Sequence, residues 1–221
     1  NVFSPDTGIG IIAGYVGLAA GAENYTGKVI NCYTSGVLKG SGAAGGIGGV
    51  LGGSGYIKNC YSSATVIDQI TNNTGKAGGI IGRVNGNANG SSIENCYTSG
   101  DISAIGGGNV GGIIGKVDNG KLVVKNCIAW NSTLTSTDKT KVGRIVGGTA
   151  NTTYENCYAH EGIILKAGET TFTVSDETSP SGSSFQGVAK SANELKGTVI
   201  NWDSSLWKEG SNGYPVFKWS K

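Results

Sequence analysis

The sequence predicts an all-β fold in which short strands stack, turn upon turn, into a solenoid of parallel sheets. The triplet Asn-Cys-Tyr, or a close variant of it, occurs five times, with steps of 28, 36, 31 and 30 residues between successive cysteines. A glycine-flanked aliphatic pair, as in residues 111–115, precedes four of these triplets. A period of about 30 residues indicates about five to six stacked turns, because one such turn cannot bury its apolar face alone.

The composition agrees with this fold and excludes several other classes of protein. Forty glycines, three prolines and 14% charged residues among 221 positions do not fit a helical protein, and the Gly-x-y period of collagen is absent. A net charge of +2 offers no electrostatic attraction for nucleic acid or an anionic membrane. Glycines interrupt the longest apolar run, residues 9–22, which is too short to span a bilayer. The chain contains no methionine, so we expect a processed or truncated piece of a larger polypeptide whose targeting segment has been removed.

The cysteines are predicted to be structural. Five is an odd number, so they cannot form a closed set of disulfides. They show no metal-ligand spacing, and His160 is the only histidine. One cysteine per turn is more simply a small buried hydrophobic residue. The predicted buried ladder comprises Cys32, Cys60, Cys96, Cys127 and Cys157.

The residues around each cysteine define the two faces of a strand. The third position before cysteine is always apolar and the next is mostly charged, which is the alternation of a strand with one face in water. Unbroken alternation would turn the cysteines outward. We favour a left-handed corner at the preceding asparagine, which tolerates that conformation, because this corner resets the phase. Cysteine then faces the core, and an outward column is formed by Tyr33, Tyr61, Tyr97 and Tyr158.

The aliphatic pair is predicted to form a second short strand in each turn. Its glycines serve the tight bends and allow neighbouring backbones to approach closely. The first turn is degenerate, since residues 11–16 lack the double glycine. Differences in repeat length are expected in loops at residues 68–77, 85–92 and 132–141.

The two halves of the repeat together resemble the GLUG-repeat family of bacterial surface proteins, named for a glycine–leucine–any–glycine motif. The resemblance extends over residues 11–158 in five copies, with local departures at Arg144, in place of a glycine, and Ile128, in place of a tyrosine. It implies a right-handed, single-stranded parallel β-helix on a secreted or cell-surface protein. It also implies one module of a larger protein, such as an adhesin-like polypeptide or the non-catalytic region of an IgA-specific metallopeptidase.

The repeat fades after the last cysteine. We expect the β-helix to occupy residues 1–175 and a capping segment, placed on the helix end within the same domain, to occupy residues 176–221. Ser191 and Glu194 predict a brief helix with a capping box that ends at Gly197. An open β-helix end exposes core and strand edges, so the aromatic tail is expected to cap it, with a carbohydrate-stacking platform as the alternative. Its candidate residues are Trp202, Trp207, Tyr214 and Trp219.

No catalytic motif is complete. Residues 160–164 read His-Glu-Gly-Ile-Ile and lack the second histidine of a zinc peptidase motif. Residues 40–45 match a dinucleotide-binding glycine pattern, but no helical pattern follows them. The aspartates do not recur at one position of the turn, so we interpret them as solvated loop residues rather than as a convergent acidic site. They are Asp68, Asp101, Asp118, Asp138, Asp176 and Asp203.

We therefore expect a non-catalytic surface or secreted module that binds a host or dietary glycan, or a surface protein, and needs no cofactor or metal. The tyrosine column carries this expectation, because spaced aromatic rings with polar tips suit such contacts. The same rings also stabilise stacked strands, and this simpler interpretation is the one that we favour for the column itself. Two alternatives stay open: a polysaccharide lyase or glycoside hydrolase, by analogy with other parallel β-helices, and a plain structural stalk.

Overall fold

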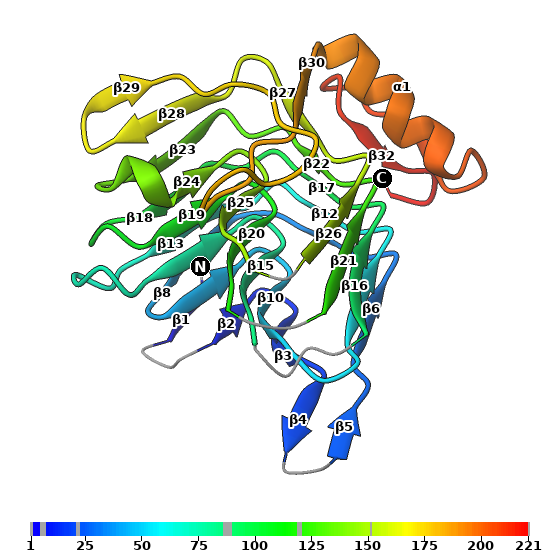
Figure 1. The fold of residues 1–221 in the computed structure, drawn as a ribbon. Coiled ribbons are helices and arrows are strands. Elements are labelled where there is room, and N and C mark those ends of the chain that lie inside the picture. Colours follow the sequence, from blue (N-terminus) through cyan, green and yellow to red (C-terminus); the bar gives the residue numbers. More distant parts are fainter. Residues whose placement is uncertain are drawn as a thin grey trace.

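The chain winds through five short strands in each turn, and equivalent strands of successive turns pair in parallel (Figure 1). Five sheets therefore run along the axis of the molecule, and the predicted parallel β-solenoid is confirmed. The computed structural model describes residues 2–4, 8–20, 23–85, 90–118, 121–150 and 152–220.

The sheets are named here in the order in which the chain enters them. Sheet A contains β1 (Val2–Ser4), β8 (Val37–Gly40), β13 (Thr65–Asp68), β18 (Ile102–Ala104), β23 (Thr133–Ser136), β28 (Ile164–Ala167) and the antiparallel β29 (Thr170–Phe172). Sheet B contains β2 (Ile9–Gly10), β9 (Ala43–Gly45), β14 (Lys76–Gly78), β19 (Asn109–Gly111) and β24 (Val142–Gly143). Sheet C contains β3 (Ala13–Val16), β10 (Gly48–Leu51), β15 (Ile81–Val84), β20 (Ile114–Val117) and β25 (Val146–Gly148).

The remaining elements complete each turn and extend the chain beyond the last one. Sheet D contains β6 (Lys28–Ile30), β11 (Tyr56–Lys58), β16 (Ser91–Glu94), β21 (Leu122–Lys125) and β26 (Thr152–Glu155). Sheet E contains β7 (Tyr33–Thr34), β12 (Tyr61–Ser62), β17 (Tyr97–Thr98), β22 (Ile128–Ala129), β27 (Tyr158–His160) and β30 (Val188–Lys190). Two antiparallel hairpins pair β4 (Leu18–Ala20) with β5 (Glu23–Tyr25) and β31 (Trp207–Glu209) with β32 (Pro215–Phe217). The helices are the 3-10 turn η1 (Lys139–Lys141) and α1 (Ala192–Trp202).

The asparagine between sheets D and E forms the predicted left-handed corner in every turn. Its φ lies between 50° and 54° in all five copies, Asn31, Asn59, Asn95, Asn126 and Asn156. From Asn59 onward, each amide nitrogen Nδ2 also donates to the Oδ1 of the asparagine one turn earlier, over 3.0–3.2 Å in the four pairs. The corner thus carries a continuous ladder of side-chain hydrogen bonds along the solenoid.

The corner turns the cysteines inward, as predicted. Cys60, Cys96 and Cys127 are fully buried, Cys157 is 6% exposed, and Cys32 in the first turn is partly accessible. All five are free thiols. Burial raises the pKa of the Cys96 thiol, because the thiolate would have no solvent around it.

Glycines allow sheets B and C to lie back to back. A Cβ at Gly78 would fall 2.0 Å from the Ile81 carbonyl oxygen and 2.6 Å from the amide nitrogen of Gly115. A Cβ at Gly115 would fall 2.5 Å from the Gly82 oxygen and 2.8 Å from the amide nitrogen of Ala77. Any side chain at these positions would force the two backbones apart, so we call this contact the glycine seam.

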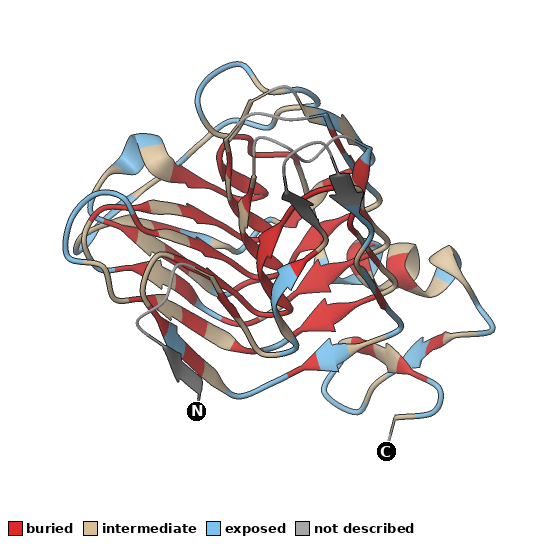
Figure 2. Cartoon of the chain, turned by 90° about the horizontal axis from the view of Figure 1, so that it is seen from below, coloured by how far each residue is buried: buried red, intermediate tan, exposed pale blue. Residues whose placement is uncertain are grey.

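The glycine seam divides the interior into two apolar clusters. One lies between sheets A and B and contains residues such as Leu38, Val66 and Ile102. The other is enclosed by sheets C, D and E and includes the cysteines with Ile80 and Ile113. Seen from below, the strands are buried along most of their length and exposure is concentrated in the connecting loops (Figure 2).

The upper end of the solenoid is closed by residues 163–187. Phe185, 1% exposed, forms backbone hydrogen bonds with Val146, and its ring centroid lies 4.2 Å from that of Tyr154 in a tilted contact. Arg144, which replaces a repeat glycine, donates to the Gly187 carbonyl and to the Asp176 carboxylate, each over 2.8 Å. The arginine that replaces the repeat glycine at position 144 therefore holds residues 163–187 against the last turn through these hydrogen bonds.

Replacing Asn126 tests the corner and the ladder separately. Asn126→Gly keeps the left-handed φ but removes the amide ladder, so the free energy of unfolding should fall by about 1–2 kcal/mol. Asn126→Ala should lose about 1 kcal/mol more, because alanine is strained at this φ. Equilibrium urea unfolding of both variants measures the order, and an alanine variant as stable as the glycine variant would contradict the role of the corner.

Thiol labelling tests the cysteine ladder. Under native conditions a maleimide should modify Cys32 alone of the five thiols, and the other four should react only after denaturation. The control is Cys32→Ser, which should remain unlabelled until it is unfolded. Rapid native labelling of two or more thiols, counted by mass spectrometry, would show that the ladder is not buried.

Candidate ligand-binding surface

The tyrosines of sheet E form a stacked column on the outside of the solenoid. The ring of Tyr61 lies 5.1 Å from that of Tyr33 and 5.0 Å from that of Tyr97, with interplanar angles of 9° and 4°. Parallel pairing of the strands places them in register. Ile128 takes the equivalent position one turn later, and Tyr158 follows it. The column thus points away from the solenoid core, as the left-handed corner requires.

The C-terminal segment, residues 188–220, covers most of this column. This corrects the expectation of an open stripe of four tyrosines. Tyr61 and Tyr97 are only 7% and 1% exposed. The ring of Phe217 lies 5.2 Å from Tyr61, and that of Trp207 lies 6.0 Å from Tyr97. The Tyr97 hydroxyl donates to the carbonyl of Pro215. These two tyrosines are therefore part of a hydrophobic core rather than of a ligand-binding surface.

The aromatic tail and the short helix are present as predicted, but they lie along the side of the solenoid and not over its end. They form a lateral core with the outward residues of sheet E (Figure 1). Its buried members are Tyr61, Tyr97, Ile128, Trp130, Leu195, Val199, Trp207 and Phe217. Beyond the expected boundary at residues 175 and 176, β30 continues sheet E as a sixth strand at residues 188–190.

Helix α1 begins with the predicted capping box between Ser191 and Glu194. It does not end at Gly197 but continues to Trp202. Leu195 and Val199, four residues apart, are fully buried against the lateral core. Burying two such side chains stabilises the helix by several times the cost of about 1 kcal/mol for an internal glycine.

The four aromatic candidates of the tail occupy different environments. Trp207 is buried, and Trp202 packs edge-on against it with centroids 6.0 Å apart. Tyr214 contacts the ring of Trp130 at 4.9 Å. Trp219 is 57% exposed. Of these four residues, Trp219 is the most exposed, since Trp202 and Tyr214 are half-buried.

Two rings remain accessible together at the lower edge of the lateral core. Tyr33 is 43% exposed, and its ring centroid lies 5.9 Å from that of Trp219. Trp219 is held in place by stacking on Phe217 at 4.8 Å and 17°. A hollow of about 450 Å³ opens beside Tyr33 and Tyr61, and the hairpin β31–β32 forms its wall. We call Tyr33, Trp219 and this hollow the aromatic platform.

The wall of the hollow carries polar groups that the sequence analysis did not single out. They are Lys208, Glu209, Ser211, Asn212 and Ser220. The Lys208 ammonium donates to the carbonyls of Lys218 and Ser220 over 3.3 Å. The short apolar run Tyr-Pro-Val-Phe at residues 214–217 is the sequence signal that could have placed a strand here, and the structure buries Pro215 and Phe217 of it.

Tyr158 and His160 do not belong to the aromatic platform. The Lys190 ammonium lies 3.8 Å from the centroid of the Tyr158 ring, which is a cation–π contact. His160 stacks on Trp130 with centroids 6.0 Å apart. Tyr158 therefore helps to attach β30 to the last turn, whereas His160 supports Trp130, whose ring contacts Tyr214 of the C-terminal segment.

The aspartates do not converge, but Asp68 corrects their interpretation as solvated loop residues. Asp68 is fully buried at the end of β13, and its carboxylate accepts from the amides of Ile70 at 2.9 Å and Lys76 at 2.5 Å. Burial raises the pKa of the Asp68 carboxyl group. This carboxylate closes the inserted loop between β13 and β14. Asp118 pairs with Arg83 and lies 21% exposed.

The other aspartates also have local partners. Asp176 pairs with Arg144, Asp101 accepts from the Thr133 amide, and Asp138 and Asp203 cap neighbouring turns. Within the described ranges, no three His, Cys, Asp or Glu side chains gather where they could hold a metal ion. No described helix is both long enough and apolar enough to cross a membrane.

The chain is similar to one solved bacterial protein over nearly its whole length. The crystal structure of a "putative immunoglobulin A1 protease" from Bacteroides ovatus matches 99% of the chain with a TM-score of 0.91 and 52% sequence identity. The chain spans 66% of that protein. This agrees with the resemblance to the non-catalytic region of an IgA-directed peptidase. No protein-family profile and no curated protein matches the chain, so the GLUG repeat itself is not confirmed.

Alkaline pH should loosen the lateral core. Burial, and then the neighbouring Tyr33, raise the pKa of Tyr61 to about 12, whereas an unfolded tyrosine titrates near 10. The fold thus favours the protonated phenol, and its contribution to stability is complete below pH 10 and is lost as the pH rises from about 10 through 12. The free energy of unfolding in urea should therefore fall between pH 10 and 12. Tyr61→Phe should show a smaller fall, and an unchanged fall would rule out Tyr61 as a contributor.

Proposed function

We propose that this chain is a non-catalytic recognition module of a secreted or surface-attached bacterial protein, and that it binds a glycan on the aromatic platform. The observation that carries the proposal is the pair Tyr33 and Trp219, which are 43% and 57% exposed. Most other aromatic residues of the C-terminal segment are at least partly buried. An exposed pair of large rings, next to a hollow with polar walls, is typical of a recognition surface.

The chemistry of the platform suits a sugar. A ring face of Trp or Tyr is apolar and covers the C–H face of a sugar, while its polar edge stays in water. Lys208, Glu209 and Asn212 line the same hollow as Tyr33 and could pair with hydroxyl groups. Because Trp219 already stacks on Phe217, little side-chain entropy would be lost on binding.

The solved relative suggests which glycoprotein to try first. Its name refers to immunoglobulin A1, and the chain spans 66% of it. We assign any protease activity to the other parts of such a polypeptide. The scattered aspartates support a non-catalytic role over a polysaccharide lyase or glycosidase, which would use convergent acidic or basic groups. A plain stalk would need no exposed ring pair.

Trp219→Ala tests the platform. On a glycan array and with immobilised immunoglobulin A1, the unmodified chain should bind, and the variant should bind about 30-fold more weakly, because a central aromatic contact is worth about 2 kcal/mol or more. Tyr33→Ala should act in the same direction. The matched control is Tyr25→Ala, a tyrosine 53% exposed on the β4–β5 hairpin, which should bind normally.

Three results would contradict the proposal. Absence of binding to every glycan, with intact folding by circular dichroism, would favour a stalk. Binding to deglycosylated immunoglobulin A1 at full strength would indicate protein recognition. Cleavage of any polysaccharide on the array would indicate an enzyme.

A further inference from the structure

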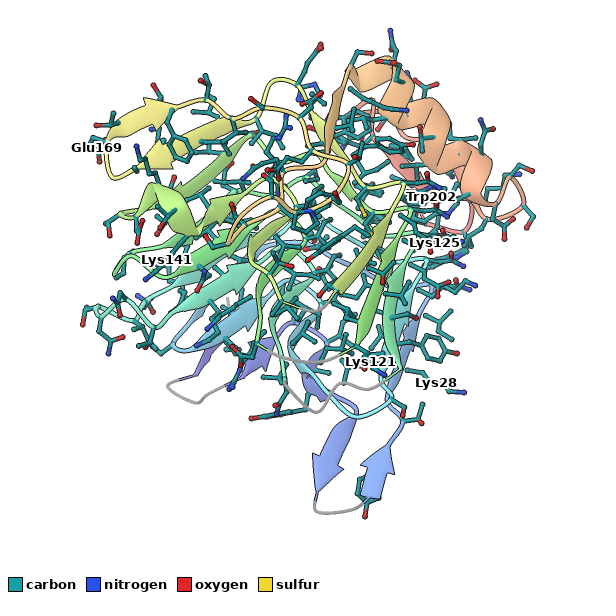
Figure 3. The ribbon with its side chains drawn as sticks, viewed as in Figure 1. Lys28, Lys121, Lys125, Lys141, Glu169 and Trp202 are labelled. Atoms are coloured by element: carbon teal, nitrogen blue, oxygen red, sulfur yellow. The ribbon has the colours of Figure 1, made fainter. Side chains whose placement is uncertain are left out.

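A second hollow lies on another face of the solenoid, away from the aromatic platform. Its volume is about 370 Å³, and it is bounded by β19, β20, η1 and the residues that follow β25. Among its lining residues are Lys116, Lys141, Asn109 and Thr149. Figure 3 shows Lys141 on this side of the molecule and Lys125 on the opposite side. We call this site the cationic hollow.

The stacking of the turns explains why the hollow exists. Lys116 in β20 is in register with Arg83 one turn below and with Gly148 one turn above. Gly148 has no side chain to cover Lys116, and a Cβ there would meet Lys116 Cγ at 3.1 Å. Asn109 is likewise in register with Lys76. The absence of a side chain at Gly148 thus leaves room for the side chains of Asn109 and Lys116, whose atoms would lie 2.7 and 3.1 Å from a Cβ there, and these two residues line the hollow.

The positive charges around the hollow exceed the negative ones. Arg83 and Lys116 share a single carboxylate, that of Asp118, with Lys116 Nζ at 3.2 Å from it. Lys76 Nζ donates only to a backbone carbonyl, that of Thr74, at 2.6 Å. Burial, and then the nearby Arg83, lower the pKa of Lys76. Two cations of neighbouring turns, Arg83 and Lys116, therefore share the one carboxylate of Asp118, which itself lines the hollow, and Lys76 lies nearby.

Lys141 adds a fourth cation from the opposite wall. Its ammonium donates to the carbonyls of Asn73 and Gly107, each over 3.2 Å, and lies 3.9 Å from the Asp138 carboxylate. These contacts fix its position above the loop ends of the two preceding turns. The hydroxyl of Thr149 and the amide of Asn109 supply polar groups on the remaining sides. The site therefore combines fixed cations, uncharged polar groups and a volume that a sugar ring can enter.

We propose that the cationic hollow binds the acidic group of a glycan, a carboxylate or a sulfate ester. Such a group would lie between Lys116 and Lys141, with the sugar ring over Gly148. It would accept charge-assisted hydrogen bonds from the two ammonium groups. Binding here is independent of the aromatic platform.

The test is titration calorimetry of the intact chain at low and at 0.3 M salt. The probes are a galacturonate oligomer, a chondroitin sulfate oligomer, neutral dextran and potassium sulfate. We expect one or both acidic oligomers to bind, with weaker binding at high salt, and dextran not to bind. Lys116→Gln should weaken binding about tenfold, because a hydrogen bond to a charged group contributes about 1.5 kcal/mol.

The control variants separate this site from general electrostatic attraction. Lys125 has one carboxylate partner, Glu155 at 3.0 Å, much as Lys116 has Asp118, so Lys125→Gln removes the same charge elsewhere. It should leave the affinity unchanged, and so should Trp219→Ala. Equal losses in the two lysine variants, absence of binding by both acidic oligomers, or loss of binding in Trp219→Ala would overturn the proposal. Inorganic sulfate binding as tightly as the oligomers would overturn the assignment to a glycan.

Discussion

The left-handed asparagine is the constraint on which the rest of the structure depends. Without it, the alternation of sheet D would continue into sheet E, and each cysteine would face water while each tyrosine faced the core. A φ near 50° at one residue per turn reverses that arrangement in all five copies. The reversal creates the tyrosine column, and the column in turn provides the apolar surface on which the C-terminal segment folds. One backbone angle thus determines both the interior and the largest feature of the exterior.

The glycine seam has a different role, because it sets the width of the solenoid. Sheets B and C approach so closely that backbone atoms take the place of side chains. The interior consequently consists of two separate apolar clusters, one on each side of the glycine seam. Where the sheets diverge at the outer end of the seam, side chains return, and Lys76, Arg83 and Lys116 occupy those positions. The faces of the molecule are consequently unlike one another, with aromatic residues on one and cations on another.

Much of the fold could be predicted from the sequence because its causes are local or periodic. The repeat period gave the solenoid, asparagine tolerates the corner, and the capping box of α1 depends on two residues three positions apart. The position of the C-terminal segment could not be predicted. The sequence indicates that an apolar residue such as Phe217 is buried, but it does not indicate which surface of the solenoid buries it. Asp68 shows the same difficulty, since its burial follows from three-dimensional closure of an inserted loop. Tyr33 and Trp219 lie next to each other only because of where the C-terminal segment packs. The sequence could therefore identify each of them as a candidate but could not show that they form a pair.

The C-terminal segment also changes how the solenoid must come apart. In a simple repeat array each turn contacts only its neighbours, so the ends can fray while the middle persists. Here the C-terminal segment begins beside the last turn, where β30 pairs with β27. It reaches the first turn through the contact of Trp219 with Tyr33. Separating any two turns that this segment covers would break its aromatic contacts with sheet E as well as the hydrogen bonds between strands. We therefore expect the turns of the solenoid and the C-terminal segment to unfold together, as one cooperative unit.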